Sequence, residues 1–308
     1  MILMGKSVKI WHVTCGSHSG NLLAKSLIDS QFTECVTPLL REFKQPGPEK
    51  ELVKRGGKKI ILPGETRWCS WRDSLRCCLS NISIVRDIVK DKIITIKPNN
   101  LNLLLDSQFE TQLLDYILIC DPICKIINKC QCSETNIADS CEDWFALDIP
   151  TDNEAYEKIV EARKNKVLKP IMLVANYLHP VYRGKRFIDL ENNKSIVHEF
   201  LAKELNVQNL NTDTHIKAFV ENTGIFAKLN KKNITSPHVY WFMAEKVHPN
   251  LSKLAQRLLK IPASSAGIER LFSNWSFIHS DLRNRLSAER SQKLIEIYYS
   301  LKMKYKLY

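Results

Sequence analysis

The sequence predicts a mainly α-helical protein with few strands. Apolar residues recur at helical spacing in several stretches of the chain. The clearest set falls at positions i, i+3, i+4 and i+7: Ile268, Leu271, Phe272 and Trp275. Strand-like alternation is scarce, and residues 8–13, VKIWHV, are a candidate for one short strand. At 308 residues and 44% apolar composition, the chain can bury a full hydrophobic core.

The N-terminal part is predicted to alternate helices with chain-breaking segments. A turn at residues 15–18 leads into a helix at residues 21–28, where three leucines form an apolar stripe. Residues 45–59 combine proline, glycine and basic side chains, which is typical of a mobile surface loop. Another helix begins near Trp71 and continues with apolar residues at helical spacing.

Residues 81–250 consist mainly of predicted helical segments joined by polar links. The main helical runs are at residues 101–130 and 154–177. Beyond them, Pro180 and Gly184 are expected to end one helix and form a turn. The region contains no internal repeat and no low-complexity tract.

Residues 262–301 predict a hairpin of two amphipathic helices. Ser264 or Ser265 is expected to cap the first helix, because a serine hydroxyl accepts a hydrogen bond from amides that lack a partner in the first turn. Ser287 precedes the second helix, and the linker at residues 280–286 is polar and basic. The second helix repeats the apolar spacing of the first: Leu294, Ile297, Tyr298 and Leu301.

The hairpin resembles a known family. Its first helix, SSAGIERLFS at residues 264–273, and the RNRLS that follows at residues 283–287 closely resemble the C-terminal dimerisation segment of hAT-family DNA transposases. Two shorter segments resemble the same family. They are Cys15-x-x-His18 followed by Asn21 and Leu22, and Thr66-Arg67-Trp68.

This resemblance implies a fold and a division of the chain. The fold is an incomplete RNase H-like α/β domain interrupted by a large all-helical insertion. We expect a remnant of the RNase H-like domain at residues 1–80, the helical insertion at residues 81–250 and the dimerisation segment at residues 251–308. The N-terminal and C-terminal pieces are then expected to approach each other in space.

The resemblance also places one catalytic position. In hAT transposases a glutamate of this segment completes an Asp, Asp, Glu triad that holds two divalent metal ions, and Glu269 is the matching residue. The second aspartate of the family lies shortly before the Cys-x-x-His pair, but residues 1–28 contain neither Asp nor Glu. One carboxylate cannot hold two cations or offset their charge. We therefore expect Glu269 to be an inactive remnant at a helix N-terminus, favourable against the helix dipole.

No enzymatic activity and no cofactor are expected, since both catalytic aspartates are missing from this chain. Mg²⁺ or Mn²⁺ would bind only as part of an intact transposase. Other catalytic motifs are absent from the sequence, including a phosphate-binding glycine loop and a His-Glu-x-x-His pair.

Nucleic acid is a candidate partner. The 45 basic and 33 acidic side chains give a net charge of +12, which favours polyanions through counterion release, although plain solubility explains the same charge. The resemblance implies that Arg67 and Trp68 lie near the family's active site, where the tryptophan can stack on a base. A core tryptophan is the alternative for Trp68. Arg283 and Arg285 in the hairpin linker are further candidates for contact with nucleic acid.

The cysteines predict packing rather than metal binding. Ten cysteines without an apolar export signal in the first fifteen residues indicate a reducing compartment, and the family resemblance implies the nucleus. Five of the ten lie within residues 120–141, but their irregular spacing in apolar surroundings favours burial over zinc. Cys15 and His18 supply only two of the roughly four ligands that a structural zinc site needs. No apolar run approaches the roughly 18 residues of a membrane span, so no membrane partner is expected.

Two functions fit these observations. The preferred one is a domesticated or truncated hAT transposase-like protein that dimerises with itself or with a related hAT protein. The alternative is the C-terminal fragment of an active metal-dependent transposase whose DNA-binding finger and aspartates lie upstream. A weaker third option is a DNA- or RNA-binding module. The dimerisation candidates, some of which must pack inside the subunit, are Leu271, Phe272, Trp275, Ile278, Leu294, Ile297 and Tyr298.

Overall fold

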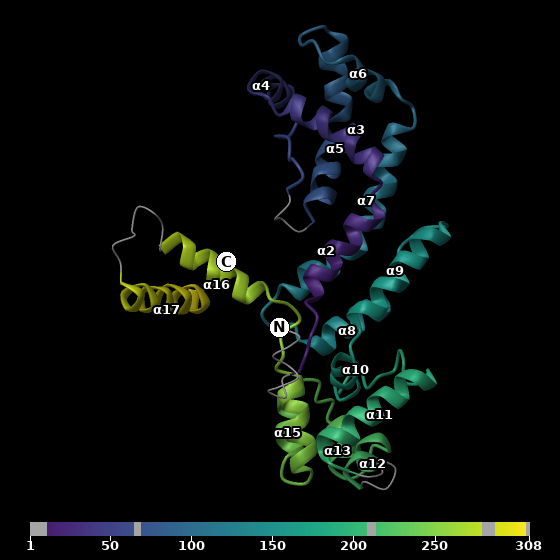
Figure 1. Cartoon of the computed structure of the whole chain (residues 1–308), viewed down its shortest axis with the longest axis vertical. Coiled ribbons are helices and arrows are strands. Elements are labelled where there is room, and N and C mark those ends of the chain that lie inside the picture. The colour runs from purple at the N-terminus through teal and green to yellow at the C-terminus, as the bar shows by residue number, and fades with distance from the viewer. Residues whose placement is uncertain (1–10, 65–68, 208–213, 279–286, 306–308) are drawn as a thin grey trace.

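Figure 1 shows the computed structural model of the chain. It describes residues 11–64, 69–207, 214–278 and 287–305. Every regular element in these ranges is an α-helix, and the one strand-like pairing among them is an isolated antiparallel bridge between Asn136 and Pro262. The prediction of a mainly α protein is therefore confirmed. Of the strand candidate, residues 8–10 lie outside the described residues, and residues 11–13 form no strand.

The helices enclose two hydrophobic cores that share the long helix α7. The α3–α7 core lies between α3 (Ser30–Phe43), α4 (Pro46–Lys54), α5 (Ser70–Lys90), α6 (Pro98–Leu105) and the first half of α7 (Phe109–Cys130). The α7–α15 core lies between the second half of α7, α2 (Gly16–Leu27), α8 (Ile137–Ala146), α9 (Glu154–Val167), α10 (Pro170–Tyr177), α11 (Glu191–Leu205), α12 (Thr214–Val220), α13 (Gly224–Lys231), α14 (Pro237–Ala244) and α15 (Pro249–Leu258). In Figure 1, α7 runs from one group of helices to the other, with α2 alongside it.

Two glycines allow α2 to lie close against its neighbours. A Cβ atom at Gly20 would lie 2.6 Å from Cγ1 of Ile127, a separation that carbon atoms do not adopt without displacement. A Cβ atom at Gly16 would lie 2.7 Å from Oγ of Ser140, and the Gly16 amide donates to the carbonyl of Ala263 at 2.9 Å. The start of the chain thus meets the segment that precedes the C-terminal hairpin, as expected, while an RNase H-like layer stays a prediction.

The prediction of a loop at residues 45–59 is wrong, because much of this segment forms helix α4. Proline suits the first helical turn, where its missing N–H has no helical partner to lose, and Pro46 starts α4 in this way. Leu52 is fully buried in the α3–α7 core, and the Glu49 carboxylate accepts from the Lys44 ammonium at 2.8 Å. The chain breakers therefore mark the start of a helix here and not a loop.

Other boundaries differ in smaller ways. The helix predicted at residues 21–28 begins earlier, at Gly16, because the Cys15 to His18 segment belongs to it. The run at 101–130 is split between α6 and α7, and the run at 154–177 is split between α9 and α10. Pro170 explains the second split, since a proline inside a helix removes a hydrogen bond and starts a new helix more readily.

The C-terminal hairpin consists of α16 (Ala266–Ile278) and α17 (Ala288–Tyr305). Figure 1 shows that it projects sideways from the junction of the two cores, and neither of its helices lies along another of the helices that the structure describes. Within the described ranges, no helix is long and apolar enough to cross a membrane.

Candidate interaction surface

The hairpin is attached to the end of α7 through backbone carbonyls. The Ser264 hydroxyl donates to the carbonyl of Cys130 at 2.8 Å, and the Arg270 guanidinium donates twice to that of Gln131, at 3.1 and 3.2 Å. The last carbonyl groups of a helix have no hydrogen-bond donor within that helix. The Ser264 and Arg270 bonds therefore supply donors to the carbonyls at the end of α7 and hold the start of α16 against it. The Ser264 hydroxyl also accepts from the amide of Ala266 at 3.3 Å, so one of the predicted capping serines contacts the first turn.

The two helices of the hairpin pack on each other through a few side chains. Ile278 of α16 and Ile295 of α17 are buried. Leu271 and Tyr298 are half-buried, and the Lys302 ammonium lies 5.0 Å from the centre of the Tyr298 ring. Of the predicted dimerisation residues, Ile278 therefore packs inside the subunit, and Leu271 and Tyr298 are only partly open to a partner.

The outer surface of the hairpin carries exposed apolar side chains in two rows. The α16 stripe, at positions i, i+4 and i+7, comprises Ile268, Phe272 and Trp275. The α17 stripe comprises Leu294, Ile297, Leu301 and Tyr305. Phe272 is 62% exposed and Ile297 is 58% exposed, so neither is held by the subunit itself. Single exposed apolar residues are ordinary, but rows of them on a projecting element are typical of interaction sites.

Four of the predicted dimerisation residues lie in these stripes, namely Phe272, Trp275, Leu294 and Ile297. Ile268 and Leu301 are part of the same helical spacing but were not among the candidates. Tyr305 lies one helical turn beyond Leu301, so continuing the pattern to the end of α17 would have found it.

Glu269 lies in the first turn of α16 and is exposed. Its carboxylate accepts a hydrogen bond from the Ser265 hydroxyl at 2.6 Å, which places it at the positive end of the helix as expected. In the part of the chain that the structure describes, no group of three or more His, Cys, Asp or Glu side chains is arranged to hold a metal ion.

The Cys-x-x-His segment lies beside the segment that carries Glu269. Cys15 Sγ lies 3.4 Å from both the amide nitrogen and the hydroxyl oxygen of Ser265, and His18 is exposed on α2. Two motifs that are far apart in the sequence are thus neighbours in space. The candidate nucleic-acid residues Arg67, Trp68, Arg283 and Arg285 all lie outside the described residues.

The cysteine cluster of residues 120–141 is mostly core. Cys120, Cys124, Cys130 and Cys141 are buried, whereas Cys132 is exposed, and all five are free thiols. Burial raises the pKa of Cys120 to about 12 and that of Cys130 to about 11. Burial therefore favours the neutral thiol form of both side chains in this structure.

One comparison with known protein families covers the C-terminal hairpin. Residues 223–301 match the family model described as the hAT family C-terminal dimerisation region. The match begins in the link before α13 and extends into α17, so it includes the hairpin together with α13 to α15. A search of curated proteins finds no match to this chain. The family match supports an hAT-family transposase-like protein with a dimerisation function.

Proposed function

We propose, from the premise that residues 223–301 match an hAT dimerisation region, that this chain works by self-association through its C-terminal hairpin and not by catalysis. The observation that carries the proposal is the exposure of the α16 and α17 stripes on an element that projects from both cores (Figure 1). The partner is a second copy of the chain or a related hAT protein.

Burial of the stripes supplies the driving force. Apolar surface removed from water contributes roughly 25 cal/mol per Å². Ile278 and Ile295 are already buried within the subunit, whereas the stripes are exposed, so the stripes are available to a partner without unpacking the subunit. A stable interface of this kind is expected to bury roughly 1,200 to 2,000 Å² in total.

Catalytic inactivity belongs to the same proposal. Glu269 is exposed and bonded to Ser265, and strand transfer with two metal ions requires further carboxylates around it. The chain would then be a domesticated or truncated relative of a transposase, located in the nucleus and keeping the assembly function. DNA contact through Arg67, Trp68, Arg283 and Arg285 would be secondary, and weakening of DNA binding with rising salt would test it.

The test of self-association is the mass of the purified chain by sedimentation velocity at low and high salt. We expect a dimer or larger species that persists at high salt, because apolar contacts are not screened by ions. A monomer at both salt concentrations would contradict the proposal. Dissociation at high salt alone would mean that charge, and not the stripes, holds the copies together.

One observation favours the alternative function, a piece of an active metal-dependent transposase. The contact between Cys15 and Ser265 brings the Cys-x-x-His segment next to the Glu269 helix, as expected if both once bordered one catalytic site. An in-frame upstream coding sequence with aspartate-bearing strands would favour this alternative. Mg²⁺- or Mn²⁺-dependent DNA cleavage by the extended chain, abolished by Glu269→Gln, would establish it and contradict the proposed inactivity.

A further inference from the structure

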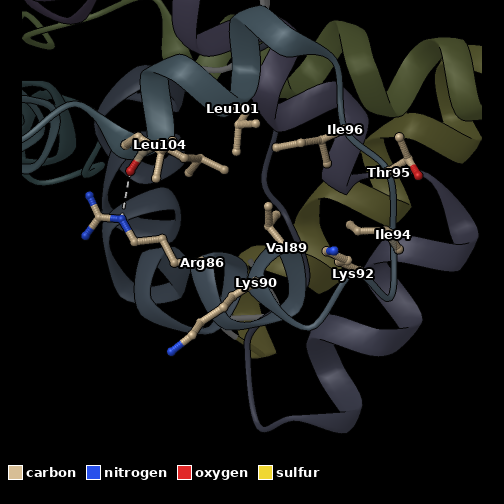
Figure 2. Close-up of a pocket in the computed structure, with 10 residues that line it drawn as sticks. Arg86, Val89, Lys90, Lys92, Ile94, Thr95, Ile96, Leu101 and Leu104 are labelled. Carbon is tan, nitrogen blue, oxygen red and sulfur yellow. Dashed lines mark hydrogen bonds between the residues drawn. The ribbon is translucent and has the colours of Figure 1, made fainter.

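An apolar pocket lies in the α3–α7 core region, away from the C-terminal hairpin. It has a volume of about 640 Å³ and opens between the end of α5, the link that follows, and α6. Figure 2 shows Val89, Ile96, Leu101 and Leu104 arranged around one hollow. Pockets of roughly 300 to 1,000 Å³ are the size that proteins use to bind ligands.

The edge of this pocket is positively charged. Its basic lining residues are Arg86, Lys90 and Lys92, and none of its lining residues is acidic. Arg86 is already engaged, since its guanidinium donates to the Leu104 carbonyl at 2.8 Å and pairs with the Glu110 carboxylate. The free positive charge at the edge therefore comes from the two lysines.

The neighbouring acidic group leaves these lysines available. Asp91 separates them in the sequence, but its carboxylate is paired with the Arg55 guanidinium at 2.8 Å. Both lysines are exposed, and Lys92 has a left-handed backbone with φ of 53° directly after the helix end. Figure 2 shows both lysines on the α5 side of the hollow, across from Leu101 of α6.

Exposed apolar residues continue beyond the pocket itself. Leu105, at the edge, is 71% exposed, and Ile93, next to Lys92, is 48% exposed. A small molecule that only filled the hollow would contact Leu105, which lines it, but would leave Ile93 in water. A peptide that lies across the opening would cover both residues and also place side chains inside.

We propose that this pocket docks an acidic amphipathic helix from a partner protein. Apolar side chains at helical spacing enter the hollow, and glutamate or aspartate side chains flanking them meet Lys90 and Lys92. The apolar contact supplies affinity, and the charge complementarity supplies specificity and orientation. The site is separate from the hairpin (Figure 1), so self-association leaves it open.

The test is fluorescence polarisation with two labelled synthetic helical peptides and the full chain. Both peptides carry leucines at i, i+3, i+4 and i+7; one has flanking glutamates and the other has lysines at the same positions. We expect the acidic peptide to bind at least about tenfold more tightly than the basic one. Absence of binding by the acidic peptide, or equal affinity for both, would overturn the proposal.

Charge-reversed variants locate the site. The double variant Lys90→Glu with Lys92→Glu should bind the acidic peptide about tenfold more weakly than the parent does, and should bind the basic peptide more tightly. The matched control, Lys166→Glu with Lys203→Glu, changes two exposed lysines on other helices by the same charge and should leave both affinities unchanged. If the control variant loses as much affinity for the acidic peptide, the loss comes from the change in net charge, and the proposed site is wrong.

An apolar variant separates docking from simple charge attraction. Leu105→Asn removes an exposed apolar side chain without adding a charge, so the fold should persist, and binding of both peptides should weaken. Unchanged affinity in this variant would mean that the peptide does not lie across the pocket, and would also overturn the proposal.

Discussion

At the scale of single residues, small or uncharged residues set several of the close contacts between elements. Gly20 lets α2 approach Ile127 on α7, and Gly16 lets the chain bond to Ala263. His179, buried after α10, accepts hydrogen bonds through Nδ1 from the amides of Val181 and Tyr182. The sequence alone predicts none of these roles, because each depends on a neighbour far away or on a side-chain direction.

Gly20→Val should destabilise the protein by about 1 to 3 kcal/mol, because the added carbons would overlap Ile127. Urea unfolding followed by circular dichroism measures the change in the free energy of unfolding. Gly47→Ala in α4 is the control, since a Cβ there meets nothing within 4 Å and should be neutral or slightly stabilising. Equal stability of Gly20→Val and the parent would contradict the close packing of α2 on α7.

His179 should make stability fall in mild acid. Burial lowers its pKa from 6.5 to about 4, while Asp139 and Glu142 oppose that shift. Between these values the unfolded chain binds a proton that the folded chain does not. His179 therefore makes its full contribution to the free energy of unfolding above pH 6.5. That contribution decreases by at most about 3 kcal/mol as the pH falls toward 4.

The measurement is the free energy of unfolding at pH 7.5 and pH 5 for the parent and for His179→Asn. Asparagine keeps a short acceptor for the turn amides but does not titrate. The variant should lose less stability than the parent over this range. The same loss in both proteins would assign the pH dependence to other groups.

At the scale of elements, helical periodicity predicts the hairpin well because both of its helices keep one apolar row. At α4 the proline and glycine residues predict a loop, but Pro46 starts a helix that buries Leu52. Helical periodicity also joins α9 to α10, since it continues across Pro170. Which apolar residues of the hairpin face inward depends on how the two helices pair, and so Ile278 could not be distinguished from Phe272 by spacing.

The attachment of α16 should depend on Ser264. Ser264→Ala removes the bond to the Cys130 carbonyl and the one accepted from Ala266, and should cost about 1 kcal/mol. Hydrogen exchange should show faster opening of the first turn of α16. Ser276→Ala, which alters an exposed hydroxyl bonded within the same helix, is the control. Unchanged exchange in Ser264→Ala would mean that the contacts of Arg270 and Ser265 hold the helix in place without Ser264.

At the scale of the whole molecule, two cores joined by α7 carry a projecting hairpin whose outer apolar rows find no cover within the described part of the chain. The sequence motif identified this hairpin, and the structure shows which of its faces is open. The sequence pattern could not predict the pocket between α5 and α6, because Val89, Ile96 and Leu104 come from separate segments that only folding brings together.

The central claim is that the α16 and α17 stripes join two copies of the chain, and light scattering of a matched set of proteins tests it most directly. Phe272→Asp with Ile297→Asp places charges in the stripes at exposed positions, and the control Leu114→Asp with Leu118→Asp does the same on α7. The parent and the control should have twice the chain mass of 35.6 kDa, as dimers, and the stripe variant should have the mass of a single chain. A monomeric parent, or a stripe variant that stays dimeric, would contradict the account.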